Sequence, residues 1–234
     1  MNRLDNKVAL VSGAARGIGA ATASLMASVG AKVVVGDILE ERGRETVKAI
    51  TASGGKASFA RLDVTSEASW NSVIAHAVKE FGGLDVLVNN AGIFLGRDFA
   101  VPALRASGAR SKHGSAIVNL ASIAGLVGSQ LDPLYSMTKG GVTLFTKSTA
   151  LAFGRKRYPI RVNSIHPGVI DTDMGEQTFV TRARNAGSND VAAARATSAS
   201  MHPIGRLGTA DDIARGIVFL ASDDSGFMTG SGMV

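Results

Sequence analysis

The sequence predicts an α/β fold in which helices cover both faces of one doubly wound parallel sheet. Short runs rich in β-branched residues alternate with longer segments of helical periodicity from the first residues onward. The predicted strands are almost continuously apolar, as is typical of strands that are covered on both faces. They are expected at residues 7–12, 31–36, 56–62, 84–89, 115–120 and 160–165. Steady alternation of strand and helix favours right-handed crossovers between parallel strands.

The segments between the first four strands have the spacing of amphipathic helices. They comprise residues 19–30, 39–55 and 67–83, and each ends in glycine, which commonly terminates a helix. No linker, repeat or low-complexity tract interrupts the 234 residues. We therefore expect a single domain that spans residues 1–234 and has a sizeable core.

The composition favours a globular protein of a reducing compartment. Hydrophobic residues make up 45% of the chain and cysteine is absent, which excludes both a disulfide framework and a thiolate metal site. The first apolar run is too short for a signal peptide, and no run reaches the length of a membrane span. The sequence thus predicts a cytoplasmic protein without a membrane partner.

Two further kinds of ligand are not expected. The net charge of +6 raises nucleic acid as a partner, but the basic residues are scattered and aromatic residues are only 5% of the chain. The histidines are dispersed without ligand spacing, so no metal site is expected. They are His76, His113, His166 and His202.

A glycine-rich stretch, GAARGIG at residues 13–19, follows the first predicted strand and leads directly into a helix. Such a turn lets the backbone approach a pyrophosphate while the helix amides point at the anion, as in a Rossmann-type domain. The second strand ends at Asp37, whose carboxylate there can accept both ribose hydroxyls of an adenosine and would repel a 2′-phosphate. This favours NAD over NADP, although Arg16 within the turn argues the other way. Asp37 could instead cap the following helix.

Two other strand ends fit the same crevice. Asp63 and Val64 follow the third strand, where an adenine would lie, and residues 89–92 lie at the mouth of the fourth. Ligands of open α/β sheets bind at the carboxyl ends of the strands. These residues are therefore expected at one edge of the sheet.

A candidate catalytic set follows the fifth strand, which ends at Ser122. Tyr135 comes 13 residues later, and Lys139 follows at the i+4 position, which places both side chains on one helix face. A free phenol has a pKa of about 10, too high for efficient proton exchange at neutral pH, and a nearby ammonium group favours the phenolate. With a serine hydroxyl to hold the substrate oxygen, this set suits hydride transfer at a carbinol carbon. The alternative is an ordinary tyrosine and lysine on a helix surface.

These motifs together resemble those of the short-chain dehydrogenase/reductase family over nearly the whole chain. The matching residues are Gly13, Gly17 and Gly19, the NNAG stretch at 89–92, Ser122, Tyr135 and Lys139, and the later Pro167, Gly168 and Thr172. The resemblance implies that Tyr135 is the acid/base and that Ser122 orients the substrate. It also implies that Lys139 favours the phenolate and binds the nicotinamide ribose, and that Thr172 contacts the nicotinamide amide.

The expected catalytic residues are thus Ser122, Tyr135 and Lys139. The residues expected to contact NAD are Gly13, Arg16, Gly17, Ile18, Gly19, Asp37, Asp63, Val64, Asn89, Ala91, Gly92, Tyr135, Lys139, Pro167, Gly168, Val169 and Thr172.

The chain departs from the family pattern in two places. The family's long helix before the fifth strand carries an asparagine of the catalytic tetrad, but residues 93–114 contain no asparagine. Residues 101–108 resemble the end of that helix and residues 93–100 the loop before it, so roughly twenty or more residues are expected to be missing between them. The last strand also stops soon after it begins, in residues 228–234. Either the sequence omits a segment that the protein contains, which predicts an intact mass above 24.0 kDa, or the deletion is real.

The substrate is expected to be a small alcohol or ketone with a hydrocarbon body. Residues 173–203 correspond to the family's substrate lid, although an amphipathic surface helix explains them equally well. The candidate lining residues near Ser122 are mostly apolar: Ile123, Ala124, Leu126, Val127 and Leu131. Several stretches look most like family members that act on hydroxysteroids and on cyclic or aryl secondary alcohols.

Two other functions remain open. A 3-oxoacyl-carrier-protein reductase would suit the positive charge, because its partner is acidic, but Asp37 argues against the NADPH that those enzymes commonly use. A non-catalytic NAD-binding protein follows if the deletion is real. A homotetramer or homodimer is expected, with the apolar residues 211–232 contributing an interface.

Overall fold

The computed structural model describes residues 3–91, 96–129 and 132–234 and confirms the predicted α/β fold. Seven strands in these residues form one parallel sheet in the order β3-β2-β1-β4-β5-β6-β7. The order reverses between β1 and β4, which makes the sheet doubly wound and leaves a crevice at their carboxyl ends. The strands are β1 Val8–Ser12, β2 Lys32–Asp37, β3 Lys56–Arg61, β4 Val86–Asn89, β5 Ser115–Leu120, β6 Ile160–Ile165 and β7 Gly232–Met233.

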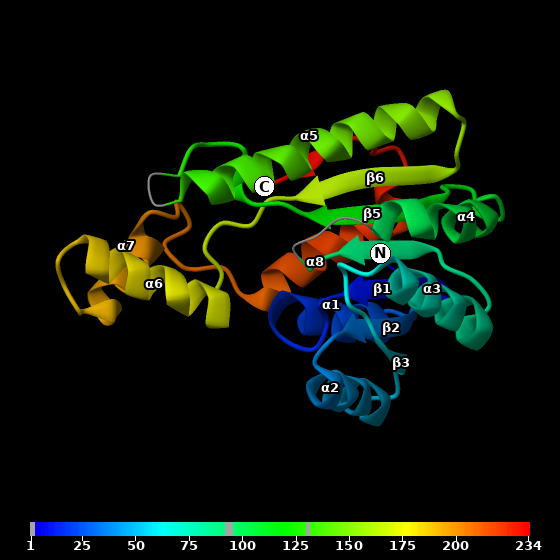
Figure 1. Ribbon diagram of the computed structural model, residues 1–234, viewed down its shortest axis with the longest axis horizontal. Coiled ribbons are helices and arrows are strands. Elements are labelled where there is room, and N and C mark those ends of the chain that lie inside the picture. The colour runs from blue at the N-terminus through cyan, green and yellow to red at the C-terminus, as the bar shows by residue number, and fades with distance from the viewer. Residues whose placement is uncertain (1–2, 92–95, 130–131) are drawn as a thin grey trace.

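Helices cover both faces of this sheet (Figure 1). On one face lie α1 Gly17–Ser28, α2 Glu40–Ala52 and α8 Ala210–Ala221, and on the other α3 Glu67–Phe81, α4 Gly96–Gly108 and α5 Pro133–Arg155. Two further helices, α6 Asp173–Asn185 and α7 Val191–Ser200, pack on each other beyond the carboxyl ends of the strands. Two short 3-10 turns, η1 Ile123–Gly125 and η2 Asp223–Ser225, complete the elements. None of the described helices is long and apolar enough to cross a membrane.

The alternation of side chains along each strand builds two apolar layers. In β1, Val8 and Leu10 join the cluster under α3, α4 and α5, whereas Ala9 and Val11 join the cluster under α1 and α8. Successive residues of a strand point to opposite faces. A strand between two apolar layers is therefore buried on both faces. This is why apolar runs in the sequence predicted the strands.

The predicted strands at 115–120 and 160–165 are confirmed at both ends, and those at 7–12, 31–36, 56–62 and 84–89 differ by at most two residues at either end. The last strand, expected within residues 228–234, is the short β7. The expected loop at residues 93–100 is wrong in part, because α4 begins at Gly96. Ala100 and Leu104, four residues apart, are buried in the same cluster as α3. This tertiary packing extends the helix toward its N-terminus.

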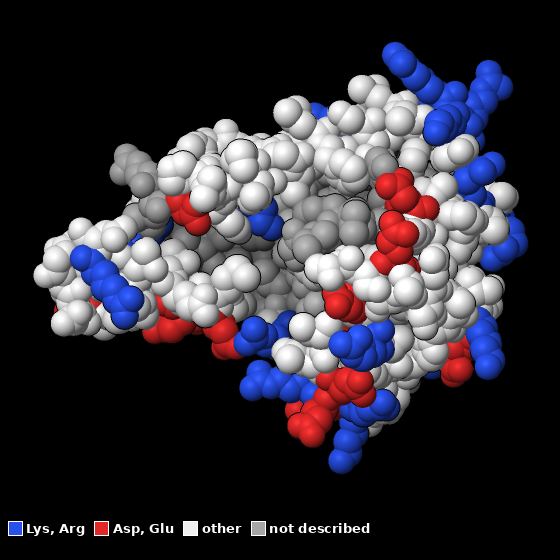
Figure 2. Space-filling model, in the orientation of Figure 1, with Lys and Arg blue, Asp and Glu red and all other residues white. Residues whose placement is uncertain are grey.

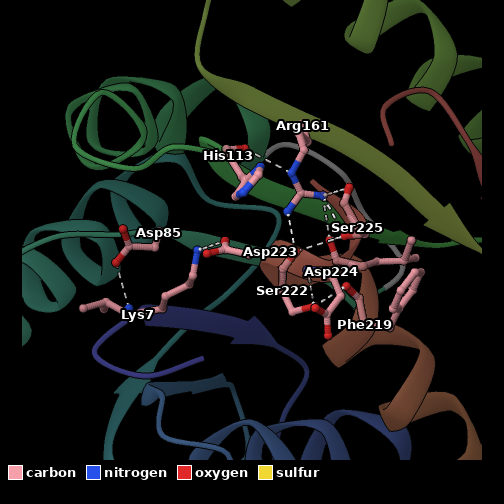
Figure 3. Close-up of polar contacts among 11 residues, drawn as sticks. Lys7, Asp85, His113, Arg161, Phe219, Ser222, Asp223, Asp224 and Ser225 are labelled. Atoms are coloured by element: carbon pink, nitrogen blue, oxygen red, sulfur yellow. Dashed lines mark hydrogen bonds and ion pairs between the residues drawn. The ribbon is translucent and has the colours of Figure 1, made fainter. Parts of the chain in front are cut away.

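At the amino ends of the strands, away from the crevice, the buried Arg161 links neighbouring backbone segments (Figure 3). Arg161, at the start of β6, donates hydrogen bonds of 3.0 Å to the backbone carbonyls of Leu220, Ser222 and Ser225, and one of 3.2 Å to that of His113. Burial lowers the pKa of Arg161. The guanidinium thus ties the segment after α8 to the amino ends of the strands.

Two more contacts reinforce this edge (Figure 3). The Lys7 ammonium lies 2.7 Å from the Asp223 carboxylate, and the Asp85 carboxylate accepts a 2.8 Å hydrogen bond from the amide of Val8. Side chains thus close the amino edge, while the carboxyl edge carries the predicted site residues.

Candidate active site

The glycine-rich turn connects β1 to the N-terminus of α1. Gly13 and Gly17 have φ values of +67° and +56°, in the left-handed region that favours glycine. A Cβ atom on Gly19 would lie 2.1 Å from the carbonyl oxygen of Gly13, so a side chain there cannot fit. The turn therefore packs tightly against the first turn of α1, which includes Ile18. The free amides of a helix N-terminus form a suitable site for a phosphate group.

Asp37 lies at the end of β2 and beside this turn. Its carboxylate accepts hydrogen bonds from the backbone amides of Ala15, at 2.9 Å, and Leu39, at 3.0 Å. The residue that caps α2 is Leu39, so the alternative role of Asp37 as the helix cap is wrong. An ionised carboxylate has about four lone-pair sites, and two remain for ribose hydroxyls.

Arg16 connects the turn to the helix pair α6 and α7. Its guanidinium forms a 3.0 Å ion pair with Asp173 at the start of α6. Thr172 caps the same helix by accepting a hydrogen bond from the amide of Gly175, and its methyl group lies 3.9 Å from the Cβ position of Gly17. The predicted contacts at the glycine turn and at Thr172 are thus neighbours in space.

The residues expected near the adenine lie at the end of β3. The Asp63 carboxylate accepts hydrogen bonds from both the hydroxyl and the amide of Thr65, which lower the pKa of Asp63. The carbonyl of Val64 accepts a 3.1 Å hydrogen bond from the indole of Trp70, which is buried in the core. Trp70 therefore anchors this loop to the sheet.

The strand end after β4 differs in detail from the expectation. The Asn89 side chain is fully buried and donates a 2.9 Å hydrogen bond to Asn119, so it faces the interior of the sheet. Its neighbour Asn90 donates to the carbonyls of Ser12 and Gly13, each at 2.9 Å. Asn90 belongs to the NNAG stretch but was not among the expected NAD contacts, and it is the residue that braces the glycine turn. Ala91 donates from its amide to the Ser12 hydroxyl at 3.2 Å, and Gly92 lies outside the described residues.

Ser122 follows β5 and caps η1, where its hydroxyl oxygen accepts a 3.2 Å hydrogen bond from the amide of Ala124. η1 lies directly against α5. A Cβ atom on Gly125 would lie 2.5 Å from the backbone carbonyl of Lys139. Gly125 therefore allows η1 and α5 to approach each other this closely.

Tyr135 and Lys139 occupy successive turns of α5, as predicted. The Asp132 carboxylate caps the helix by accepting a 2.9 Å hydrogen bond from the Tyr135 amide, and the Tyr135 side chain remains 36% exposed. The Lys139 ammonium lies 5.6 Å from the centre of the Tyr135 ring and donates a 2.9 Å hydrogen bond to the carbonyl of Leu120. Burial lowers the pKa of Lys139.

The segment after β6 lies beside η1. The Pro167 carbonyl accepts a 3.0 Å hydrogen bond from the amide of Ile123. Gly168 packs against His202, whose imidazole accepts a 3.2 Å hydrogen bond from the amide of Val169. Figure 2 shows a hollow at the base of the lobe formed by α6 and α7, next to the body of the molecule.

This arrangement can exchange a proton with a bound oxygen atom, because α5 brings a phenol and an ammonium group to the sheet edge where the Ser122 hydroxyl also lies. Of the predicted apolar lining, Leu126 and Val127 are exposed after η1, and Leu131 lies outside the described residues. In residues 3–91, 96–129 and 132–234, no group of three potential metal-binding side chains occurs. His76 on α3 pairs with the Ser58 hydroxyl at 2.9 Å.

Two family models match the chain, one described as short chain dehydrogenase over residues 7–107 and one as enoyl-(acyl carrier protein) reductase over residues 99–234. A trans-4-hydroxycyclohexanecarboxylate dehydrogenase of Sinomonas cyclohexanicum is 39% identical over 263 aligned positions, which cover 99% of this chain and 92% of that protein. A 3-alpha-(or 20-beta)-hydroxysteroid dehydrogenase of Mycobacterium bovis is 38% identical, with 99% and 88% covered. The structure of carveol dehydrogenase from Mycobacterium avium in complex with NAD matches with a TM-score of 0.88 at 26% identity, covering 100% of this chain and 97% of that one.

The first of these alignments is longer than the chain itself. Because it has 263 positions and the chain has 234 residues, at least 29 positions (263 less 234) hold a residue of the relative and none of this chain. This agrees with the expectation that roughly twenty or more family residues have no counterpart here.

The family model for short chain dehydrogenases matches residues 7–107, and a dehydrogenase that is 39% identical aligns with 99% of this chain. The chain therefore belongs to the short-chain dehydrogenase family.

Proposed function

We propose that the protein is an NAD(H)-dependent oxidoreductase that interconverts a secondary alcohol and a ketone. The observation that carries the proposal is the position of Lys139, whose ammonium group lies 5.6 Å from the Tyr135 ring centre and is bonded to the end of β5, two residues before Ser122. A lysine on an ordinary helix surface would extend into solvent and would not donate a hydrogen bond to the end of the neighbouring strand. The pair is therefore interpreted as catalytic.

In the proposed reaction, each side chain has one task. The Ser122 hydroxyl donates a hydrogen bond to the substrate oxygen and holds it in place. Tyr135, as the phenolate, takes the hydroxyl proton of the alcohol, and in the reverse direction the phenol returns a proton to the ketone. The ammonium group of Lys139 stabilises the phenolate by its charge. The bound nicotinamide supplies the acceptor or donor of the hydride.

The residues at the sheet edge fit NAD. The glycine turn leaves no room for a side chain at Gly19, Asp37 has lone pairs for the ribose hydroxyls, and Arg16 is already paired with Asp173. A 2′-phosphate would meet the Asp37 carboxylate without a free guanidinium from Arg16. In support, the carveol dehydrogenase structure is a complex with NAD.

For the substrate we propose a secondary alcohol with a bulky, cyclic or steroid-like hydrocarbon body. Leu126 and Val127 expose apolar side chains directly after η1, and relatives named for a hydroxycyclohexane and a hydroxysteroid support this class. Residues 173–203, which contain α6 and α7, would form the lid over it. The lid and the rest of residues 1–234 would act as one domain.

A homodimer or homotetramer is part of the proposal. Met137, Leu144 and Leu151 are spaced by seven residues along α5 and are 67%, 66% and 71% exposed. A stripe of large apolar side chains on one helix face suits contact with a second copy. The segment 211–232 was expected to form an interface. The apolar side chains of α8, which lies in this segment, are mostly buried in the core and do not form a comparable exposed stripe.

Reduction of an acyl-carrier-protein substrate is the second candidate, favoured by the description of the family model that covers residues 99–234 and by the net charge of +6. The test is a panel of cyclic secondary alcohols, hydroxysteroids and acyl thioesters, assayed with NAD(H) and NADP(H). Turnover of the alcohols with NAD supports the proposal. Turnover of thioesters alone overturns it in favour of the second candidate, and NAD binding without turnover indicates a binding protein.

A further inference from the structure

The hydrogen-bond ladder between β5 and β6 is interrupted beside Ser122. The Ala121 amide donates to the carbonyl of Ile165 at 2.9 Å, and the Ile123 amide donates to that of Pro167 at 3.0 Å. In a parallel ladder the bond between these two would come from the amide of residue 167. Pro167 has no N–H to give. The backbone that positions Ser122 thus lies at a gap in the sheet.

The imidazole of His166 lies next to this gap and contacts the backbone of Ser122. Its Nδ1 lies 3.2 Å from the carbonyl oxygen of Ser122, and its Nε2 lies 2.8 Å from the Ser164 hydroxyl. A carbonyl oxygen can only accept, so Nδ1 carries the hydrogen and Nε2 accepts from Ser164. The ring is only 1% exposed. Burial lowers the pKa of His166; the bond to Ser122 opposes this shift and the charges of Lys147 and Lys139 add to it, so the net pKa is lowered and the neutral ring is favoured.

The C-terminal strand β7 holds this ring in place. The His166 amide donates a 2.7 Å hydrogen bond to the carbonyl of Met233, and a Cβ atom on Gly232 would lie 2.7 Å from Nε2 of His166. The space beside the imidazole is therefore full, and the ring cannot turn away from Ser122 without moving β7.

We propose that His166 is a positioning residue whose Nδ1–H group holds the carbonyl of Ser122 and thereby fixes the Ser122 hydroxyl toward the substrate. The inference rests on the proposed function, since it assigns His166 to the same reaction. It differs from a core histidine that merely fills space, because it makes the donor at Nδ1, and not the ring volume, the property that matters.

Two substitutions separate these possibilities. In His166→Asn the side-chain amide nitrogen stands the same number of bonds from the backbone as Nδ1 and keeps a donor for Ser122. In His166→Gln the amide lies one bond further out, near the position of Nε2, and the donor to Ser122 is lost. Both variants lose the ring, so each controls for the packing change in the other.

We expect His166→Gln to lower kcat by about 10- to 100-fold, the effect of a misplaced reacting group, with KM for NAD unchanged. His166→Asn should retain kcat within about threefold of the wild type, because its donor is kept. NADH binding and thermal unfolding of both variants establish that they fold. Equal kcat values in the two variants, whether both high or both low, would overturn the inference.

A nitrogen NMR spectrum of the histidine-labelled protein provides a readout that does not depend on turnover. The neutral Nδ1–H form is expected for His166 at neutral pH, and the Nε2–H form would contradict the inference. A wild type without turnover of any secondary alcohol or ketone overturns the proposed function, while the NMR spectrum still tests the bond between His166 and Ser122. The two failures are thus distinguishable.

Discussion

The ammonium nitrogen of Lys139 donates a 2.9 Å hydrogen bond to the backbone carbonyl of Leu120, and this bond joins α5 to the end of β5. Ser122 follows the end of the strand by two residues, and the helix carries Tyr135 one turn earlier than Lys139. One contact thus relates the three predicted catalytic residues. Because the lysine is half-buried where it makes this bond, the contact has an energetic consequence that can be measured.

Lys139→Met should change the pH dependence of stability. Burial lowers the pKa of Lys139 below its ordinary value of 10.5, so the unfolded chain binds this proton more tightly than the folded protein does. Between the two pKa values the unfolded state holds more protons, and the free energy of unfolding of the wild type rises with pH. The variant lacks this contribution. Urea denaturation of both proteins from neutral pH to about 10.5 should therefore show the wild type gaining stability relative to the variant, and parallel curves would contradict the assignment.

Asp37→Asn should weaken the preference for NAD. The substitution removes the negative charge that repels a 2′-phosphate, and we expect the ratio of kcat/KM for NAD to that for NADP to fall by about tenfold or more. Asp63→Asn is a matched control, because it removes another carboxylate from the same sheet edge and should leave the ratio within about threefold. An unchanged ratio in Asp37→Asn would show that this carboxylate does not select the cofactor.

Gly125→Ala should separate η1, which follows Ser122, from α5, which carries Tyr135 and Lys139. The added Cβ would lie 2.5 Å from the Lys139 carbonyl, so the backbone of η1 or α5 must shift. We expect a loss of roughly 100-fold in kcat/KM and a cost of about 1–3 kcal/mol in the free energy of unfolding. Gly128→Ala is the control, since a Cβ atom there meets nothing within 4 Å. Similar activity in the two variants would mean that this close approach does not position Ser122.

Replacing Leu144 and Leu151 together by glutamate should dissociate the proposed oligomer. Both side chains lie in the exposed stripe on α5, and burying charges at an apolar interface is unfavourable. Sedimentation analysis should show a multiple of the subunit mass for the wild type and one subunit for the variant. Val78→Glu, at an exposed apolar position on α3, is the control and should leave the assembly intact. A monomeric wild type would rule out this interface.

The sequence was most informative where one local pattern decides the structure. The strands at 115–120 and 160–165 were predicted at both ends, and every residue of these two strands is buried. The i, i+4 spacing likewise placed Tyr135 and Lys139 on successive turns of one helix. Family motifs placed the remaining site residues along the same sheet edge.

The sequence did not predict the contacts between residues that are distant along the chain. Asn89 and Asn90 are adjacent and identical in chemistry, yet the first is buried against Asn119 and the second braces the glycine turn. Arg16 forms an ion pair with Asp173, which lies 157 residues later in the sequence. Such pairs depend on the twist of the sheet and on the packing of the lobe, which local periodicity does not record.

The central claim is that Tyr135 exchanges the proton during hydride transfer to NAD, and Tyr135→Phe tests it most directly. The variant keeps the aromatic ring beside Lys139 and removes only the hydroxyl group. Oxidation of cyclohexanol by NAD, followed through the absorbance of NADH, should fall by about 10²- to 10⁴-fold, while the Kd for NADH stays within about threefold of the wild type. A variant that oxidises cyclohexanol at a rate within about tenfold of the wild type would contradict the claim.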